Sequence, residues 1–194
     1  MKFLKYLKSA SKHITHNPLN SSINILGLGI GIAVFTLIIL YVRFQRSYNN
    51  FHENMNQIYR AEATLGGISP ASFYPFFKNN PKIENGVRIV SVSTLLNYTK
   101  PGEMPKPGID AKIYAVDTTF FNVFTYPVIA GSKDELFESG KNIALSEETA
   151  KRLFGDENPI NKEIRYGTNE ATVKVVIKNV PENSSLKFDA IKLM

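Results

Sequence analysis

The amino-acid sequence predicts an α+β protein in which one N-terminal transmembrane helix is followed by a mixed α+β extracytoplasmic domain. Three observations predict this class. The 194-residue chain has no charged side chain between residues 17 and 42, short apolar segments alternate with turn residues after position 46, and the net charge of +6 lies at one end. Residues 1–46 hold six basic and no acidic side chains. Residues 47–194 hold the other 17 of the 23 basic residues and all 17 acidic ones, so their net charge is zero.

The transmembrane segment is predicted from length and composition. Its apolar core, residues 23–42, is 20 residues long, and a helix of that length spans ~30 Å, the thickness of the hydrocarbon core of a bilayer. A buried helix of a soluble protein seldom has so long an apolar run. The run is also too long for a signal peptide, and Arg43-Phe44-Gln45-Arg46 follows it where a cleavage site would need small residues. We therefore expect a retained helix over residues 18–46.

The flanking charges predict the orientation. Four lysines and the terminal amine precede the span, and two arginines, Arg43 and Arg46, follow it. Positive charges are retained on the cytoplasmic side, so residues 1–17 are expected in the cytoplasm and residues 47–194 outside it. Apolar residues interleave with the lysines, which predicts a basic amphipathic segment lying on anionic lipid head groups; a frayed basic tail is the alternative. These membrane-surface residues are Lys2, Lys5, Lys8 and Lys12.

Two glycines predict a contact within the membrane. Gly27 and Gly31 are four residues apart and lie on one face of the helix, a spacing that allows a second helix to approach closely. Gly29 lies between them, but the three glycines do not form a dinucleotide-binding motif, which would follow a strand in a soluble βαβ unit. We therefore expect Gly27 and Gly31 to pack against another transmembrane helix.

The extracytoplasmic residues predict short strands and helices in alternation. Residues 47–60 read as a polar continuation of the membrane helix, and Ser146 and Gly155 mark the start and end of the best-defined helix. Asp134 and Glu135 read as part of a solvated loop. The expected strands are residues 58–64, 87–96, 109–117, 142–145, 163–166, 172–180 and 188–193, and the other expected helices begin at Ser69-Pro70 and cover residues 118–124.

No pattern in the sequence predicts catalysis or cofactor binding. The chain has no cysteine, which excludes disulfides, thiolate metal sites and thiol nucleophiles. It has no Gly-x-x-x-x-Gly-Lys-Ser/Thr motif for ATP, and His52-Glu53 lacks the second histidine of a zinc protease helix. We expect His52 to be a surface or juxtamembrane residue. The neutral extracytoplasmic part argues against nucleic-acid binding, and we expect no enzyme activity, no cofactor and no metal.

Several segments resemble the MacB/FtsX-like permease family of ABC transporters, in the variant whose permease and ATPase are separate polypeptides. They keep the family's order along nearly the whole chain. The segments are INILGLGIGIA (23–33), YNNFHEN (48–54), IYR (58–60), Val116-Asp117 with Phe120-Phe121 and Phe124, ALSEETAKRLFG (144–155), NPINKEI (158–164) and VIKNVPENSSLKFD (176–189).

The resemblance implies a non-catalytic membrane subunit in a bacterial inner membrane. In this view residues 18–46 are the first transmembrane helix, and residues 47–194 are a MacB-like periplasmic core domain. A separate cytoplasmic ATPase would bind the ATP and be coupled to export or to regulation of an extracytoplasmic partner, and the permease would form a dimer. The alternative is a membrane-anchored extracytoplasmic sensor or ligand-binding module.

The resemblance also implies a longer protein than the sequence given. Members of the family continue past the last matched segment to three more spans, so the domain in residues 47–194 is expected to be truncated. A strand such as Val173–Val180 would then have an unpaired edge, open to pairing between molecules.

Overall fold

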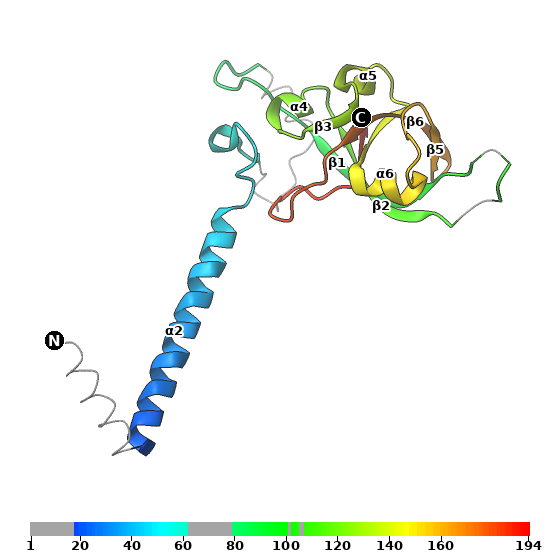
Figure 1. Ribbon diagram of the computed structural model, residues 1–194. Helices are drawn as coiled ribbons and strands as arrows, with labels where there is room; N and C mark the ends of the chain where they lie inside the picture. Colours follow the sequence, from blue (N-terminus) through cyan, green and yellow to red (C-terminus); the bar gives the residue numbers. More distant parts are fainter. Residues whose placement is uncertain (1–17, 62–78, 101, 105–106) are drawn as a thin grey trace, which may run out of the picture. The chain divides into compact units, whose positions relative to one another are not determined.

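The computed structural model describes residues 18–61, 79–100, 102–104 and 107–194, which fall into two compact units, residues 1–47 and 48–194 (Figure 1). In the first unit the described residues form one helix, α2 (Pro18–Arg46). Pro18 starts this helix, where its missing N–H costs no hydrogen bond. The predicted helix over residues 18–46 is present, and the α+β class is confirmed by the second unit.

The predicted continuation of the membrane helix over residues 47–60 is wrong, because α2 ends at Arg46. Ser47 closes it, with an N–H that donates to Arg43 O and a hydroxyl that donates to Phe44 O at 2.7 Å. Asn49 then takes a left-handed conformation, with φ of 60°, which an α-helix cannot accommodate. Turns and one short 3-10 helix, η1 (Met55–Gln57), follow.

The strand expected over residues 58–64 is not seen in residues 58–61. The rest of that segment, and the helix expected at Ser69-Pro70, lie outside the described residues.

The second unit is built on a seven-stranded mixed sheet with the order β3-β6-β4-β7-β2-β1-β5. β2 runs parallel to β7 and β4 parallel to β6, and the other pairs are antiparallel. The strands are β1 (Ile89–Asn97), β2 (Ile109–Val116), β3 (Val128–Gly131), β4 (Asn142–Ser146), β5 (Glu163–Tyr166), β6 (Asn169–Ile177) and β7 (Ala190–Leu193). The helices are α4 (Phe120–Val123), α5 (Lys133–Phe137) and α6 (Glu147–Phe154).

The sheet closes on itself through β5. This four-residue strand pairs with β1 at Leu96 and Asn97 and with β6 over residues 169–172, so that six strands form a ring. β3 occupies the remainder of the same β6 edge, and β4 pairs with the other edge. The prediction that Val173–Val180 has an unpaired edge is therefore wrong: the strand ends at Ile177 and is paired on both sides.

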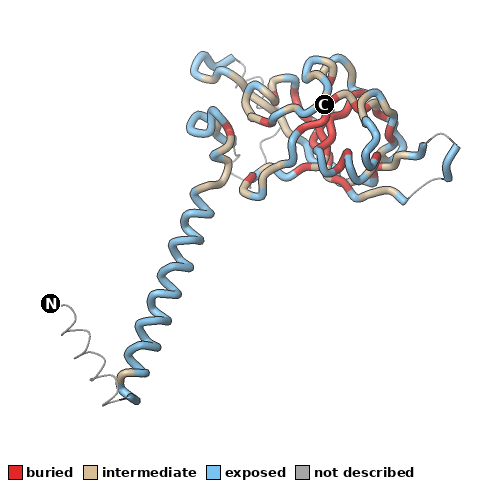
Figure 2. Tube along the Cα trace, viewed as in Figure 1, coloured by how far each residue is buried: buried red, intermediate tan, exposed pale blue. Residues whose placement is uncertain are grey.

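Two apolar clusters lie on the two faces of this sheet. One draws on all six ring strands and fills the ring, with Leu96, Ile113, Leu145 and Val173 among its members, and Phe154 of α6 packs into it. The other covers the opposite face, where Phe120, Tyr126, Leu136 and Phe188 pack over outward-facing strand residues. Figure 2 shows this core as the buried part of the domain.

α6 and α5 show how local capping sets the helices around the ring. The Ser146 hydroxyl accepts the Thr149 N–H at 3.2 Å, and Gly155 ends α6 with φ of 64°, as predicted. The prediction of a solvated loop at Asp134 and Glu135 is wrong, because both lie in the first turn of α5. Their carboxylates favour the positive helix N-terminus, where the Ser132 hydroxyl accepts the Asp134 N–H at 3.3 Å.

A bulge in β6 lets this strand contribute neighbouring valines to both apolar clusters. Its register against β4 shifts at Lys174, since Ile143 pairs with Val173 whereas Ala144 pairs with Val175. As a result Val173 belongs to the ring interior and Val175 to the opposite cluster, although residues two apart share a face in a regular strand. Gly131 of β3 approaches this bulge with φ of 86°, and a Cβ at this position would lie 1.9 Å from the Lys174 carbonyl oxygen.

We predict that Gly131→Ala destabilises the domain by about 2 kcal/mol or more, because the methyl group would collide with backbone at an already unfavourable φ. Gly140→Ala is the control, since a Cβ there has nothing within 4 Å. Urea unfolding of the full chain in detergent, followed by near-ultraviolet circular dichroism of its tyrosines, measures both. Equal midpoints for the two variants would contradict the close approach of β3 to the bulge.

Candidate functional site

α2 has the properties of a membrane span. Within the part of the chain that is described, it is the one helix long and apolar enough to cross a bilayer. None of its residues is buried (Figure 2). The hydroxyl of its polar Thr36 is satisfied within the helix, because it donates to Ile32 O at 2.8 Å.

The predicted packing face of α2 is open. A Cβ built on Gly27 or on Gly31 has no atom within 4 Å apart from the adjoining backbone of its own helix. The geometry therefore leaves room for a second helix, but the contact itself stays a prediction. The lysines predicted at the membrane surface (Lys2, Lys5, Lys8 and Lys12) lie outside the described residues.

The turn that follows α2 is fixed to a distant loop by Asn49. Its N–H donates to Asn183 O, its side-chain amide donates to the Ser185 hydroxyl, and its side-chain oxygen accepts the Ser185 N–H, each at 2.8 Å. The left-handed φ of Asn49 is tolerated by asparagine better than by most residues, and it directs all three groups to the same loop. The chain is thus held by the second unit from the third residue after the end of α2.

His52 forms the second attachment of this turn. It is buried, with 4% of its surface exposed, and its Nδ1 accepts the N–H of Thr125 at 3.1 Å. The N–H of Glu53 donates to the Thr125 hydroxyl at 3.1 Å. Of the two predicted placements of His52, the surface placement is wrong, and the juxtamembrane placement stays a prediction. Three aromatic rings enclose the imidazole: Phe51, Phe124 and Tyr126, with centroids 4.0, 5.3 and 5.4 Å away.

Burial controls the protonation of this cluster. It lowers the pKa of His52 below 6.5, although the hydrogen bond at Thr125 acts in the opposite direction. Burial also raises the pKa of Tyr126 to about 12. Both rings are therefore neutral near pH 7. Because Nδ1 accepts a hydrogen bond, the proton of the neutral imidazole is on Nε2.

An ion pair fixes the start of β1 to the end of β2. Asp117 is 8% exposed. Its carboxylate accepts the backbone N–H of Arg88 at 2.8 Å and N–H groups of the Arg88 guanidinium at 2.6 to 3.2 Å. Burial acts to raise the pKa of Asp117, but the hydrogen bonds and charge of Arg88 hold it below its usual value.

A second group of ion pairs is exposed and joins Glu157 to Lys100 and Lys162. The hydrogen bonds from the two lysines lower the pKa of Glu157 to about 2.

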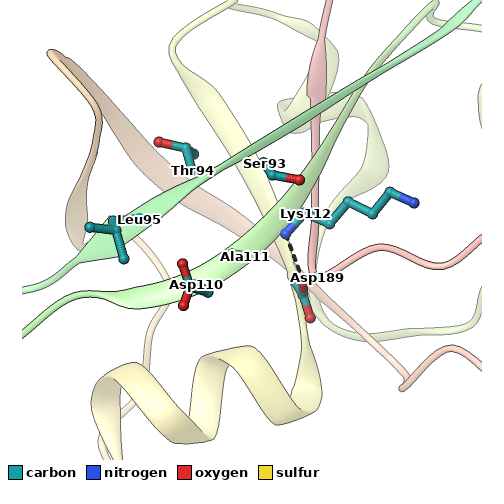
Figure 3. Close-up of a pocket in the computed structure, with 7 residues that line it drawn as sticks. All are labelled: Ser93, Thr94, Leu95, Asp110, Ala111, Lys112 and Asp189. Carbon is teal, nitrogen blue, oxygen red and sulfur yellow. Dashed lines mark hydrogen bonds between the residues drawn. The ribbon is translucent and has the colours of Figure 1, made fainter.

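An open hollow of about 380 Å³ lies against the β1–β2 pair (Figure 3). Its polar groups are partly engaged, since the Asp189 carboxylate accepts the backbone N–H of Lys112 at 2.7 Å. The residues that line this hollow are Ser93, Thr94, Leu95, Asp110, Ala111, Lys112 and Asp189.

The described residues contain no group of three His, Asp or Glu side chains that could hold a metal ion.

Comparison with known families decides the class of this protein. The family model for the MacB-like periplasmic core domain matches residues 21–191, which includes most of α2 and nearly all of the second unit. The chain belongs to the MacB-like periplasmic core domain family. The predicted resemblance is confirmed. No curated protein matches the sequence.

Two solved structures resemble this MacB-like chain. The extracellular domain of the noncanonic ABC-type transporter YknZ from Gram-positive bacteria has 15% identity and a TM-score of 0.52, and the match covers 63% of this chain and 61% of that structure. The periplasmic region of MacB from Actinobacillus actinomycetemcomitans has 20% identity and a TM-score of 0.41, with 55% and 46% covered. The chain thus spans less than two thirds of either structure. The YknZ match shows a shared fold.

We predict that Gly27→Leu combined with Gly31→Leu leaves membrane insertion intact, since leucine is favourable at that depth. The two side chains would separate α2 from a neighbouring helix and weaken its association by about 1 kcal/mol or more. Gly29→Leu is the matched control, because residue 29 lies about 200° around the helix from residue 27. Förster transfer between labelled chains in bilayers measures the association. Equal transfer in both variants and the parent would exclude a contact through Gly27 and Gly31.

Proposed function

We propose that this MacB-like chain supplies the first transmembrane helix and the periplasmic core domain of a non-catalytic permease subunit of an ABC-type transporter. The observation that carries the proposal is the single family match over residues 21–191, which joins the membrane helix to the domain without a break. The fold shared with the extracellular domain of YknZ supports the transporter class.

In this proposal the chain transmits movement and does not carry out chemistry. The family to which the chain belongs works with a separate ATPase, and we assign ATP hydrolysis to such a cytoplasmic partner. Its conformational change would move the membrane helices of a permease dimer, and the periplasmic domains would use this movement for export or for regulation of a partner.

The ATPase partner is tested by co-purification. We expect the tagged full chain, expressed in its native host and extracted in several mild detergents, to retain an ABC ATPase that mass spectrometry identifies. An unrelated tagged single-span protein of the same membrane is the control. Absence of an ATPase in every detergent would refute the coupling, and a ligand-induced rise in the melting temperature would then support the sensor alternative.

The orientation is tested separately. We expect a reporter that is active only in the periplasm to function after Met194 and to fail before Lys2, because the N-terminal flank is the more positive. Replacing Lys2, Lys5, Lys8 and Lys12 with Gln removes about 1 kcal/mol of attraction to the anionic surface per lysine, so part of the population should invert. A cytoplasmic signal from the wild-type fusion after Met194 would exclude the permease orientation.

A further inference from the structure

The end of α2 and the start of the domain are separated by very little chain. Ser47 still bonds to the last turn of the helix, and Asn49 is already hydrogen-bonded to Asn183 and Ser185. Tyr48 is therefore the one residue between a capped helix and an anchored turn. A single residue spans at most ~3.6 Å when extended, so the covalent connection between the two units is short.

The attachment of this turn has two parts with different chemistry. Asn49 contributes three hydrogen bonds between groups that remain uncharged at any pH of interest. His52 contributes a hydrogen bond in which a titratable nitrogen is the acceptor for the Thr125 N–H. Asn49 and His52 are also joined directly, because the His52 N–H donates to Asn49 O at 3.0 Å.

Protonation of His52 is incompatible with this arrangement. A proton on Nδ1 would point at the Thr125 N–H, so that one hydrogen bond is replaced by two opposed donors. The resulting imidazolium would be buried, and Nε2, which has no hydrogen-bond partner among the described residues, would carry a second buried N–H of a charged ring.

Among the described residues, the side chains packed against His52 offer no compensating charge. The rings packed against it are Phe51 in its own turn and Phe124 and Tyr126 after α4. Tyr126 is the titratable member of these three, and its raised pKa keeps it neutral. Glu53 is next in sequence, but it is exposed and reaches this site through its backbone N–H.

We propose that Asn49, His52 and Glu53, together with Thr125, Asn183 and Ser185, form a membrane-proximal latch that fixes the chain leaving the membrane helix to the domain and opens when His52 is protonated. The latch is closed at neutral pH. As the pH falls below 6.5, the unlatched state gains protons that the closed state excludes, and the stability of the latch is progressively lost. Its mechanical role, passing helix movement to the loops at residues 124–126 and 183–185, rests on the proposed transporter function.

The test is hydrogen exchange of the full chain in detergent or nanodiscs, with rates corrected for the intrinsic effect of pH. Between about pH 7.5 and about pH 5 we expect protection at the Thr125 amide and in residues 49–53 to fall about fivefold or more, while the β6 amides keep theirs. In His52→Asn, whose Oδ1 replaces the Nδ1 acceptor but does not titrate, protection should not depend on pH. The other two histidines of the chain, His13 and His16, are replaced together by Asn as the matched control, which should behave like wild type.

A second variant separates the two parts of the latch. Asn49→Gly keeps the left-handed turn but removes the side-chain bonds to Ser185, so exchange at residues 183–185 should rise at every pH. Asn161→Gly is its control, since Asn161 also has a left-handed φ, of 66°, and bonds to Lys174 elsewhere in the domain. If His52→Asn fails to fold, histidine-labelled NMR of the wild type replaces it: the His52 titration and the loss of Thr125 protection must coincide.

Unchanged Thr125 protection between the two pH values, or the same pH response in His52→Asn, would overturn the latch. Neither result depends on an ATPase. Failure of the latch is therefore distinguishable from failure of the proposed function, which the co-purification at neutral pH decides. Once an ATPase is captured, ATP should change exchange at residues 124–126 in the wild type, and this change should be lost in Asn49→Gly if the latch passes on helix movement.

Discussion

The bridging of β1 and β6 by the short strand β5 is the constraint on which the rest of the domain depends. Without it the mixed sheet would have two open ends and a cluster of aliphatic side chains facing solvent. With it, six strands enclose those side chains, and Phe154 of α6 packs into the same cluster. The bulge at Lys174 lies where the same edge of β6 passes from its pairing with β5 to its pairing with β3. Gly131 of β3 approaches the β6 backbone at this point.

The closed ring gives the chain a packed domain that begins close to the end of α2 in the sequence. The second unit begins at Tyr48, two residues after the end of α2, and its first residues are held by loops that are far away in sequence, at 124–126 and 183–185. These loops follow α4 and precede β7, and Tyr126 and Phe188 beside them belong to the outer apolar cluster. In the proposed transporter role, this short connection, with its hydrogen bonds and aromatic packing, would let movement of the membrane helix reach the domain.

The sequence was sufficient for the features that depend on local chemistry. The membrane helix follows from an uninterrupted apolar run, and α6 follows from a serine cap, two acidic residues in the first turn and a closing glycine. β1, β2, β4 and β5 were predicted within about two residues from their apolar and turn patterns. By contrast, β3 and α5 were missed, since a four-residue strand and a five-residue helix carry too few side chains for a periodic signal.

What the sequence alone determined is a membrane-anchored α+β chain of the MacB-like type, because hydropathy, capping and family motifs are properties of neighbouring residues. Only the tertiary structure decided which strands have free edges, that the helix ends at Arg46, and that His52 is buried. Each of these depends on groups far apart in the chain: Asn49 meets Ser185, and His52 meets Thr125, 73 residues away. The residues next to His52 in the sequence do not indicate that its imidazole will accept a backbone N–H from Thr125. Its burial therefore becomes apparent only in the folded domain, where the ring of strands has brought the loops together.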